Sequence, residues 1–200
     1  MACALTTGRQ LPCKESVGGL SRVYFADYGT LGTATIASGN ISALSGTPSF
    51  FEYDLKGATS SLTTNIISSR DTGTTVYETT LELTFTHLDV ATQEEIKLLA
   101  AARPHVVVED NNRVTGSSVD PDTDSTANYL MVGFHQGAEV TAGTIVSGAA
   151  YSDLSGFTLT FTATEVIPPL FITGSVVTAL KSSTQTVSYT HLTLPTTPYV

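Results

Sequence analysis

The most regular pattern of hydrophobic and polar positions lies between residues 73 and 110. Residues 77–86 alternate between two faces. One face carries Tyr77, Thr79, Leu81, Leu83 and Phe85, and the other carries Glu78, Thr80, Glu82, Thr84 and Thr86. A period of two is typical of a strand with one buried and one wet face. We therefore predict a long strand over residues 74–87, in which His87 falls on the inward face as a hydrogen-bonded core histidine.

A helical pattern follows this strand. Ile96, Leu99, Ala100 and Arg103 follow at helical spacing, and Leu98 widens the apolar stripe. Asp89 and Thr92 are N-cap candidates, and Thr92 with Glu95 matches a capping box. Pro104 ends the helix because proline has no N–H to donate and restricts the residue before it. The pattern predicts one short helix at about residues 91–103, followed by a strand at 105–108.

Shorter runs predict the remaining strands, at residues 20–28, 33–36, 41–44, 49–56, 61–68, 129–136, 139–146 and 157–164. The strands at 61–68 and 74–87 are joined by a polar turn and would form a long hairpin. Large side chains occupy both faces at residues 20–28, and aromatic residues cluster at Phe50, Phe51 and Tyr53. Either a second sheet covers them, or they form contacts between subunits.

We expect a mainly β fold: an antiparallel β-sandwich or barrel-forming sheet with one short α-helix. Residues 1–17 read as an N-terminal arm, residues 18–167 as the β-sandwich domain ended by Pro168 and Pro169, and residues 168–186 as a C-terminal extension. Residues 187–196, VSYTHLTLPT, back-translate without mismatch to GTC TCT TAT ACA CAT CTG ACG CTG CCG ACG, the read-through of a common transposon-based sequencing adapter. We interpret residues 187–200 as a translated adapter.

Composition limits the classes of function. The chain has 200 residues, of which 41% are hydrophobic and 14% charged, so it has enough apolar material for a core. Its net charge is −9 with nine Lys and Arg, which argues against tight nucleic-acid binding, because that requires cations to replace phosphate counterions. No run is long enough to span a membrane. The first residues lack the apolar core of a secretory signal, so we expect folding in a cytoplasm.

No pattern predicts catalysis or a cofactor. Asp120, Asp122 and Asp124 have the D-x-D-x-D spacing of a calcium loop, but Ser125 and Met131 stand where Gly and Glu are needed. A solvated acidic loop is the preferred interpretation, and a weak calcium site is the alternative. Two cysteines, Cys3 and Cys13, cannot close a zinc site by themselves. We predict that the protein is not an enzyme.

The outward faces of the two longest strands carry Thr and Glu with no Lys or Arg, which would suit the lining of a water-filled channel. The segments Phe51-Glu52-Tyr53-Asp54-Leu55-Lys56-Gly57 and Ser61-Leu62-Thr63, the run RPHVVVEDNN, and GFHQGAEVTAGTIVSGAAYSDLSGFTLTFTATE resemble structural proteins of tailed bacteriophages. The layout over residues 1–167 is most similar to that of the tail tube, or major tail, proteins. Residues 113–126 read as a longer loop than the short turn of such proteins.

The resemblance implies a β-sandwich flanked by a helix that assembles into stacked rings, usually hexameric, in the virion tail. DNA would pass through the lumen without specific binding, and no membrane is involved. The hairpin and the N-terminal arm would then contact other subunits and other tail proteins. The candidate contact residues are Leu62, Ile66, Arg70, Tyr77, Leu5 and Leu11. The alternatives are a virion binding or decoration module that uses Phe50, Phe51 and Tyr53, and a head–tail connector that forms a single ring.

Overall fold

The computed structural model describes residues 8, 17–55, 59–113, 127–173 and 175–182. Strands and helices follow in the order β1 (Leu20–Ala26), β2 (Ala34–Ala37), β3 (Asn40–Leu44), β4 (Phe51–Asp54), β5 (Ser61–Ser69), β6 (Thr74–Thr86), α1 (Val90–Ala101), β7 (His105–Arg113), β8 (Ala127–Val132), β9 (Glu139–Val146), β10 (Gly156–Glu165), β11 (Leu170–Ile172) and α2 (Ser175–Ser182). The mainly β fold is confirmed. Most predicted strands recur with ends shifted by no more than two residues, but β7 extends five residues beyond its predicted end at residue 108, and β8 ends four residues before its predicted end at residue 136.

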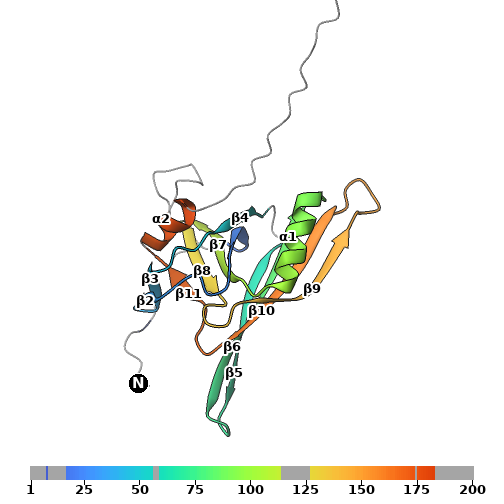
Figure 1. Ribbon diagram of the computed structural model, residues 1–200. Helices are drawn as coiled ribbons and strands as arrows, with labels where there is room; N and C mark the ends of the chain where they lie inside the picture. The colour runs from blue at the N-terminus through green and yellow to red at the C-terminus, as the bar shows by residue number, and fades with distance from the viewer. Residues whose placement is uncertain (1–7, 9–16, 56–58, 114–126, 174, 183–200) are drawn as a thin grey trace, which may run out of the picture.

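The strands form two sheets (Figure 1). The larger, seven-stranded sheet has the order β2-β3-β11-β8-β7-β1-β4, and the smaller, four-stranded sheet has the order β5-β6-β10-β9. Every pair in the four-stranded sheet is antiparallel. Among the described residues, neither sheet closes into a barrel.

One hydrophobic core lies between the two sheets. The inward residues of β6 and β10 are buried there, as the alternation predicted, and Val23 and Phe25 of β1 meet them from the opposite sheet. The ring centroids of Phe25 and Phe161 are 5.4 Å apart. Helix α1 contributes Leu99 to this core, so it covers an open side of the sandwich.

The N-terminus of α1 is fixed by Asp89, whose carboxylate accepts a hydrogen bond from the Thr92 amide. This confirms Asp89 as the N-cap and corrects the second candidate, because Thr92 lies inside the helix as the amide donor. The helix ends at Ala101, two residues earlier than predicted, and Ala102 has an extended backbone.

A second core lies on the other face of the seven-stranded sheet. Here α2 buries Val176, Val177 and Leu180 together with Tyr24 of β1 and Ile41 of β3. Strand β1, residues 20–26, therefore has both faces covered by its own chain, as the second-sheet alternative partly predicted, whereas Tyr28 beyond it is 51% exposed. A sheet covers one face, and a helix contributes to covering the other.

The predicted domain boundary after residue 167 is wrong. Strand β11 lies inside the seven-stranded sheet, where it pairs parallel with β3 and antiparallel with β8. Pro168 and Pro169 form a connection into this strand and do not end the domain. Residues 170–173 and 175–182 belong to the fold, and α2 is a second helix that the sequence pattern did not predict.

Candidate functional site

The outer face of the four-stranded sheet is a broad polar surface. It points away from the core and consists of the residues that alternate with the buried ones. The exposed or half-buried members of this outer face include Ser61, Thr63, Asn65, Glu78, Thr80, Glu82, Thr86, Ala142, Thr144, Thr158, Thr160, Thr162 and Thr164. Hydroxyl groups dominate it because threonine combines a high strand propensity with a polar atom.

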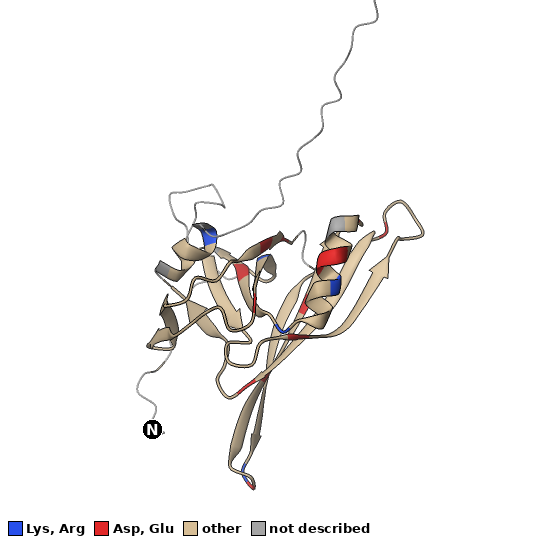
Figure 2. Ribbon diagram, in the orientation of Figure 1, with Lys and Arg blue, Asp and Glu red and all other residues tan. Residues whose placement is uncertain are grey.

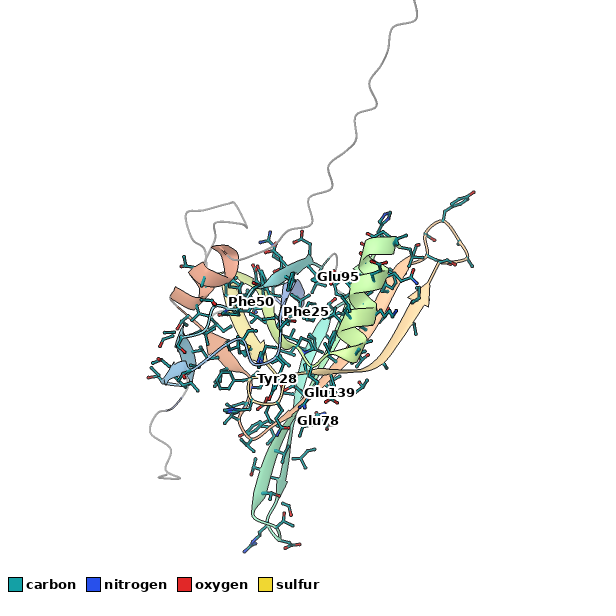
Figure 3. The ribbon with its side chains drawn as sticks, in the orientation of Figure 1. Phe25, Tyr28, Phe50, Glu78, Glu95 and Glu139 are labelled. Carbon is teal, nitrogen blue, oxygen red and sulfur yellow. The ribbon has the colours of Figure 1, made fainter. Side chains whose placement is uncertain are left out.

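The charge on this sheet has one sign. Its four strands contain Glu78, Glu82, Glu139 and Glu165 and no Lys or Arg (Figure 2). Figure 3 labels Glu78 and Glu139. Glu139, at the start of β9, forms an ion pair with Arg103 at 3.0 Å. Glu165 is buried and accepts hydrogen bonds from the amides of His135 and Gln136. Glu78 and Glu82 therefore supply the negative charge at the middle of the outer face.

The hairpin of β5 and β6 projects beyond the rest of the sandwich (Figure 1). Two successive residues near its tip, Ile66 and Ile67, are 67% and 55% exposed. Because successive strand residues point to opposite faces, the hairpin presents an isoleucine on each side. Ile66 lies opposite Tyr77, and Ile67 lies opposite Val76. These exposed aliphatic residues make the hairpin a candidate contact surface.

The predicted contact residues fall into three groups. Ile66 and Arg70 are exposed on the hairpin, and Tyr77 is half-buried there. Leu62 is half-buried and packs against the core between the sheets, so part of its side chain serves the fold. Leu5 and Leu11 lie outside the described residues. The structure thus brings Ile66, Arg70 and Tyr77 together on one hairpin.

The two edge strands of the four-stranded sheet contain no Lys, Arg or Pro. The outer strands are β5, SLTTNIISS, and β9, EVTAGTIV. Lysine, proline and bulges are the usual features that prevent one sheet edge from pairing with another. Only a bulge is present here, at Thr141 near the start of β9, where the register with β10 shifts. Residues 142–146 of this edge are regular and contain Ile145, which is 63% exposed.

His105 is the centre of a cluster that connects two loops. Its Nδ1 lies 2.7 Å from the Gly133 carbonyl oxygen, and its Nε2 accepts a hydrogen bond from the Gly29 amide at 3.0 Å. Tyr28 stacks on the imidazole ring, with centroids 5.1 Å apart. Burial lowers the pKa of His105 below its usual value, against the opposing effects of the Gly133 carbonyl and of Glu165. The neutral ring therefore joins the loop after β1 to the loop after β8.

An open cavity of about 490 Å³ lies beside this cluster, lined in part by Tyr28, Ile36, His105 and Phe134. Both nitrogens of His105 are already engaged with backbone groups. The ring is therefore held as a structural group and is not poised to act as a general base.

A second open cavity of about 420 Å³ is lined by Tyr53, Asp54, Phe85, Thr86, His87, Asp89 and Thr92. The prediction that His87 is a core residue is wrong, because this side chain is exposed at the cavity. Strand β6 ends at Thr86, and His87 has a φ of 80°, so the alternation stops one residue earlier than the sequence suggests. Burial, with a smaller contribution from Glu95, raises the pKa of Tyr53 to about 12.

The aromatic residues proposed for a binding module do not form an exposed patch. Phe50 is buried in the second core with an exposure of 1%. Tyr53 packs on Phe25 and Phe85 in the first core. Of the three, Phe51 alone is exposed. Alternation along this edge strand is irregular, which is why the sequence could not separate the three rings.

Buried charges elsewhere are paired within the fold. Arg22 lies 3.0 Å from Asp54 and 3.7 Å from Glu52, and Glu109 accepts a hydrogen bond from Tyr24 at 3.2 Å.

Within the ranges that the structure describes, no three His, Cys, Asp or Glu residues gather as a metal site, and no helix is long and apolar enough to cross a membrane. Asp120, Asp122 and Asp124 lie outside those ranges.

A scan against protein-family models found no match to this sequence, and a search of curated proteins found none either.

Proposed function

We propose that this protein is a tail tube subunit of a tailed bacteriophage, and that it assembles into stacked rings that conduct DNA. In this assembly the outer face of the four-stranded sheet lines the lumen. The observation that carries the proposal is the character of this face: rows of threonine hydroxyls, Glu78 and Glu82, and no Lys or Arg within the strands. The resemblance of residues 1–167 to tail tube proteins supports it independently.

The chemistry of the face suits a DNA conduit. A cation in the wall would replace counterions of the phosphate backbone and retain the DNA, and each such contact adds to affinity. A wall of hydroxyls and carboxylates remains hydrated and repels phosphate at short range. The net charge of −9 has the same consequence for the whole surface. In this role the protein is structural and performs no catalysis.

The projecting hairpin supports self-assembly. Ile66 and Ile67 expose aliphatic surface on opposite sides of a ribbon that extends past the sandwich. Such surface costs free energy in water, at about 25 cal/mol for each Å² left exposed. Burial against other copies of the chain would remove this cost. The virion tail, with the subunit made in the host cytoplasm, is the location that this role requires.

The proposal is tested by negative-stain electron microscopy of the full chain at increasing protein concentration. We expect rings with a central hole, and stacks of these rings. A matched variant, Ile66→Ser with Ile67→Ser, should keep the fold by circular dichroism and lose most of the stacks. A chain that stays monomeric at the highest concentration, while folded, would refute the proposal. Isolated rings that never stack would instead favour a connector.

A further inference from the structure

We propose that a small cavity beside Glu165 binds one dehydrated monovalent metal ion, with sodium as the best fit. The cavity lies where the end of β10 meets the loop after β8 and the connection into β11. Three observations carry this inference: a buried carboxylate oxygen without a hydrogen-bond partner, a buried charge without a counter-charge, and a cavity of matching size. The inference is independent of the proposed function.

The first observation is the state of the two carboxylate oxygens of Glu165. This residue ends β10 and is 7% exposed. Its Oε1 accepts hydrogen bonds from the amides of His135 and Gln136 at 2.8 Å and 2.9 Å, which fix the orientation of the side chain. Its Oε2 is buried and has no hydrogen-bond partner among the described residues. A buried charged acceptor is costly in this state, so we expect a ligand to satisfy it.

The second observation is the charge of Glu165. Within the described part of the chain, no Lys or Arg forms an ion pair with it. His105 is close enough to be affected by this charge, but burial lowers the pKa of His105 and the ring stays neutral. Arg103 is paired with Glu139. Buried charges in proteins are usually paired with an opposite charge or coordinate a metal ion.

The third observation is the cavity that Glu165 lines. Its volume is about 10 Å³, which is room for one water-sized particle. The buried Thr79 can donate its hydroxyl proton to Thr64 Oγ1 at 3.0 Å, which leaves the lone pairs of its own oxygen for a cation. Pro168 and Pro169 have no N–H that could satisfy the carboxylate. The other lining residues have no polar side chain and are Met131, Val132, Gly133, Phe134 and Ile167.

The charge and the size of the site select the ion. One carboxylate has a single negative charge, which one monovalent ion balances. Zinc needs four ligands and calcium sites combine several carboxylates, whereas no three His, Cys, Asp or Glu gather here among the described residues. A water-sized space excludes a hydrated ion and any large organic cation. The ligands of a bare sodium ion would be Glu165 Oε2, Thr79 Oγ1 and main-chain carbonyl groups of the lining segments.

An ion at this position connects the two sheets. Thr79 belongs to β6 and Glu165 to β10 of the four-stranded sheet, whereas Met131 and Val132 belong to β8 of the seven-stranded sheet. The unfolded chain does not hold these groups together, so the ion binds the folded state and stabilises it.

Thermal unfolding in different salts tests the site. The full chain would be followed by circular dichroism in sodium chloride and in choline chloride, at equal ionic strength and one protein concentration. Glu165→Gln keeps an acceptor for the two amides and removes the charge, and the control Glu82→Gln makes the same change at an exposed position. With sodium at about ten times its dissociation constant, the parent and Glu82→Gln should melt about 3–6 °C higher than in choline. Glu165→Gln should show no such difference.

Two results would overturn the proposal. Equal melting temperatures of the parent chain in both salts would mean that water alone satisfies Oε2. A difference that persists in Glu165→Gln would be a general effect of the salts. If Glu165→Gln does not fold, Thr79→Val replaces it, because this variant removes the hydroxyl ligand and keeps the carboxylate. The same rise should then require more sodium, and an unchanged sodium dependence would contradict the site. None of these results bears on the proposed function.

Discussion

Replacing Leu180 with alanine tests whether the C-terminal segment belongs to the core. Leu180 lies in α2 and has an exposure of 0% in the cluster that contains Tyr24, Ile41 and Tyr129. The sequence alone placed this residue in an extension beyond the domain. The structure makes it one of the most completely buried side chains of the chain.

The expected magnitude follows from the size of the deletion. Leu→Ala at a fully buried site costs about 2–5 kcal/mol, from lost transfer free energy and from the cavity left behind. For a domain of this size, 1 kcal/mol lowers the melting temperature by about 2–4 °C. Taking about 3 kcal/mol as a central value, the melting temperature should fall by about 6–12 °C.

The matched control is Leu98→Ala, because Leu98 is 63% exposed on α1. This variant should stay within about 0.5 kcal/mol of the parent chain. Unfolding in urea would be followed by circular dichroism, with all chains at one protein concentration because assembly would add stability. If Leu180→Ala changes the free energy of unfolding no more than Leu98→Ala does, then α2 does not contribute to the core.

Three further predictions concern pH, capping and charge. Burial lowers the pKa of His105 in the folded state, so the neutral ring favours the fold above the unfolded pKa of about 6.5. This stability is lost as the pH falls below that value. Between pH 7 and pH 5, the free energy of unfolding should therefore fall less in His105→Gln than in the parent chain. Asp89→Ala should cost about 1 kcal/mol in urea unfolding through loss of the N-cap, whereas Asp89→Asn, which keeps the acceptor, should cost less; equal losses would contradict the capping role. Glu82→Lys should make the assembled protein retain DNA in a filter assay in a salt-dependent way, and Glu94→Lys, the same charge change on an exposed position of α1, should retain less; equal retention would count against a lumen-lining face.

The sequence predicted the parts of the fold that local patterns determine. Alternation from Tyr77 to Phe85 identified the central strand, and Asp89 identified the start of the helix, because both signals depend on near neighbours. Strand β9 was predicted with its observed bounds. The polar face of the sheet could be read in the same way, since the outward residues are those between the buried ones.

The remaining errors concern contacts between distant residues. Strand β11 has three residues, and its place beside β3 depends on a parallel pairing across more than a hundred positions, so no local pattern could show it. Phe50 is buried and Phe51, its neighbour, is exposed. Which of the two is buried depends on the second core, whose residues are distant in the sequence. His87 lies outside the strand because its φ is 80°, a value uncommon for residues other than glycine.

The stagger between β5 and β9 is likewise a property of the folded sheet. It follows from the observed register of three strand pairs and cannot be read from any single strand. Ile66 and Ile145 are aliphatic residues on the inward sides of the two edge strands. A single copy leaves both of them largely in water.

The central claim, that the outer face of the four-stranded sheet lines a lumen, is tested most directly by a cryo-electron microscopy map of the assembled full chain. We predict a ring in which Thr158, Thr160 and Thr162 of β10 face the central hole, with the seven-stranded sheet and α2 on the outside. A ring whose hole is lined by α1, α2 or the seven-stranded sheet would contradict the account.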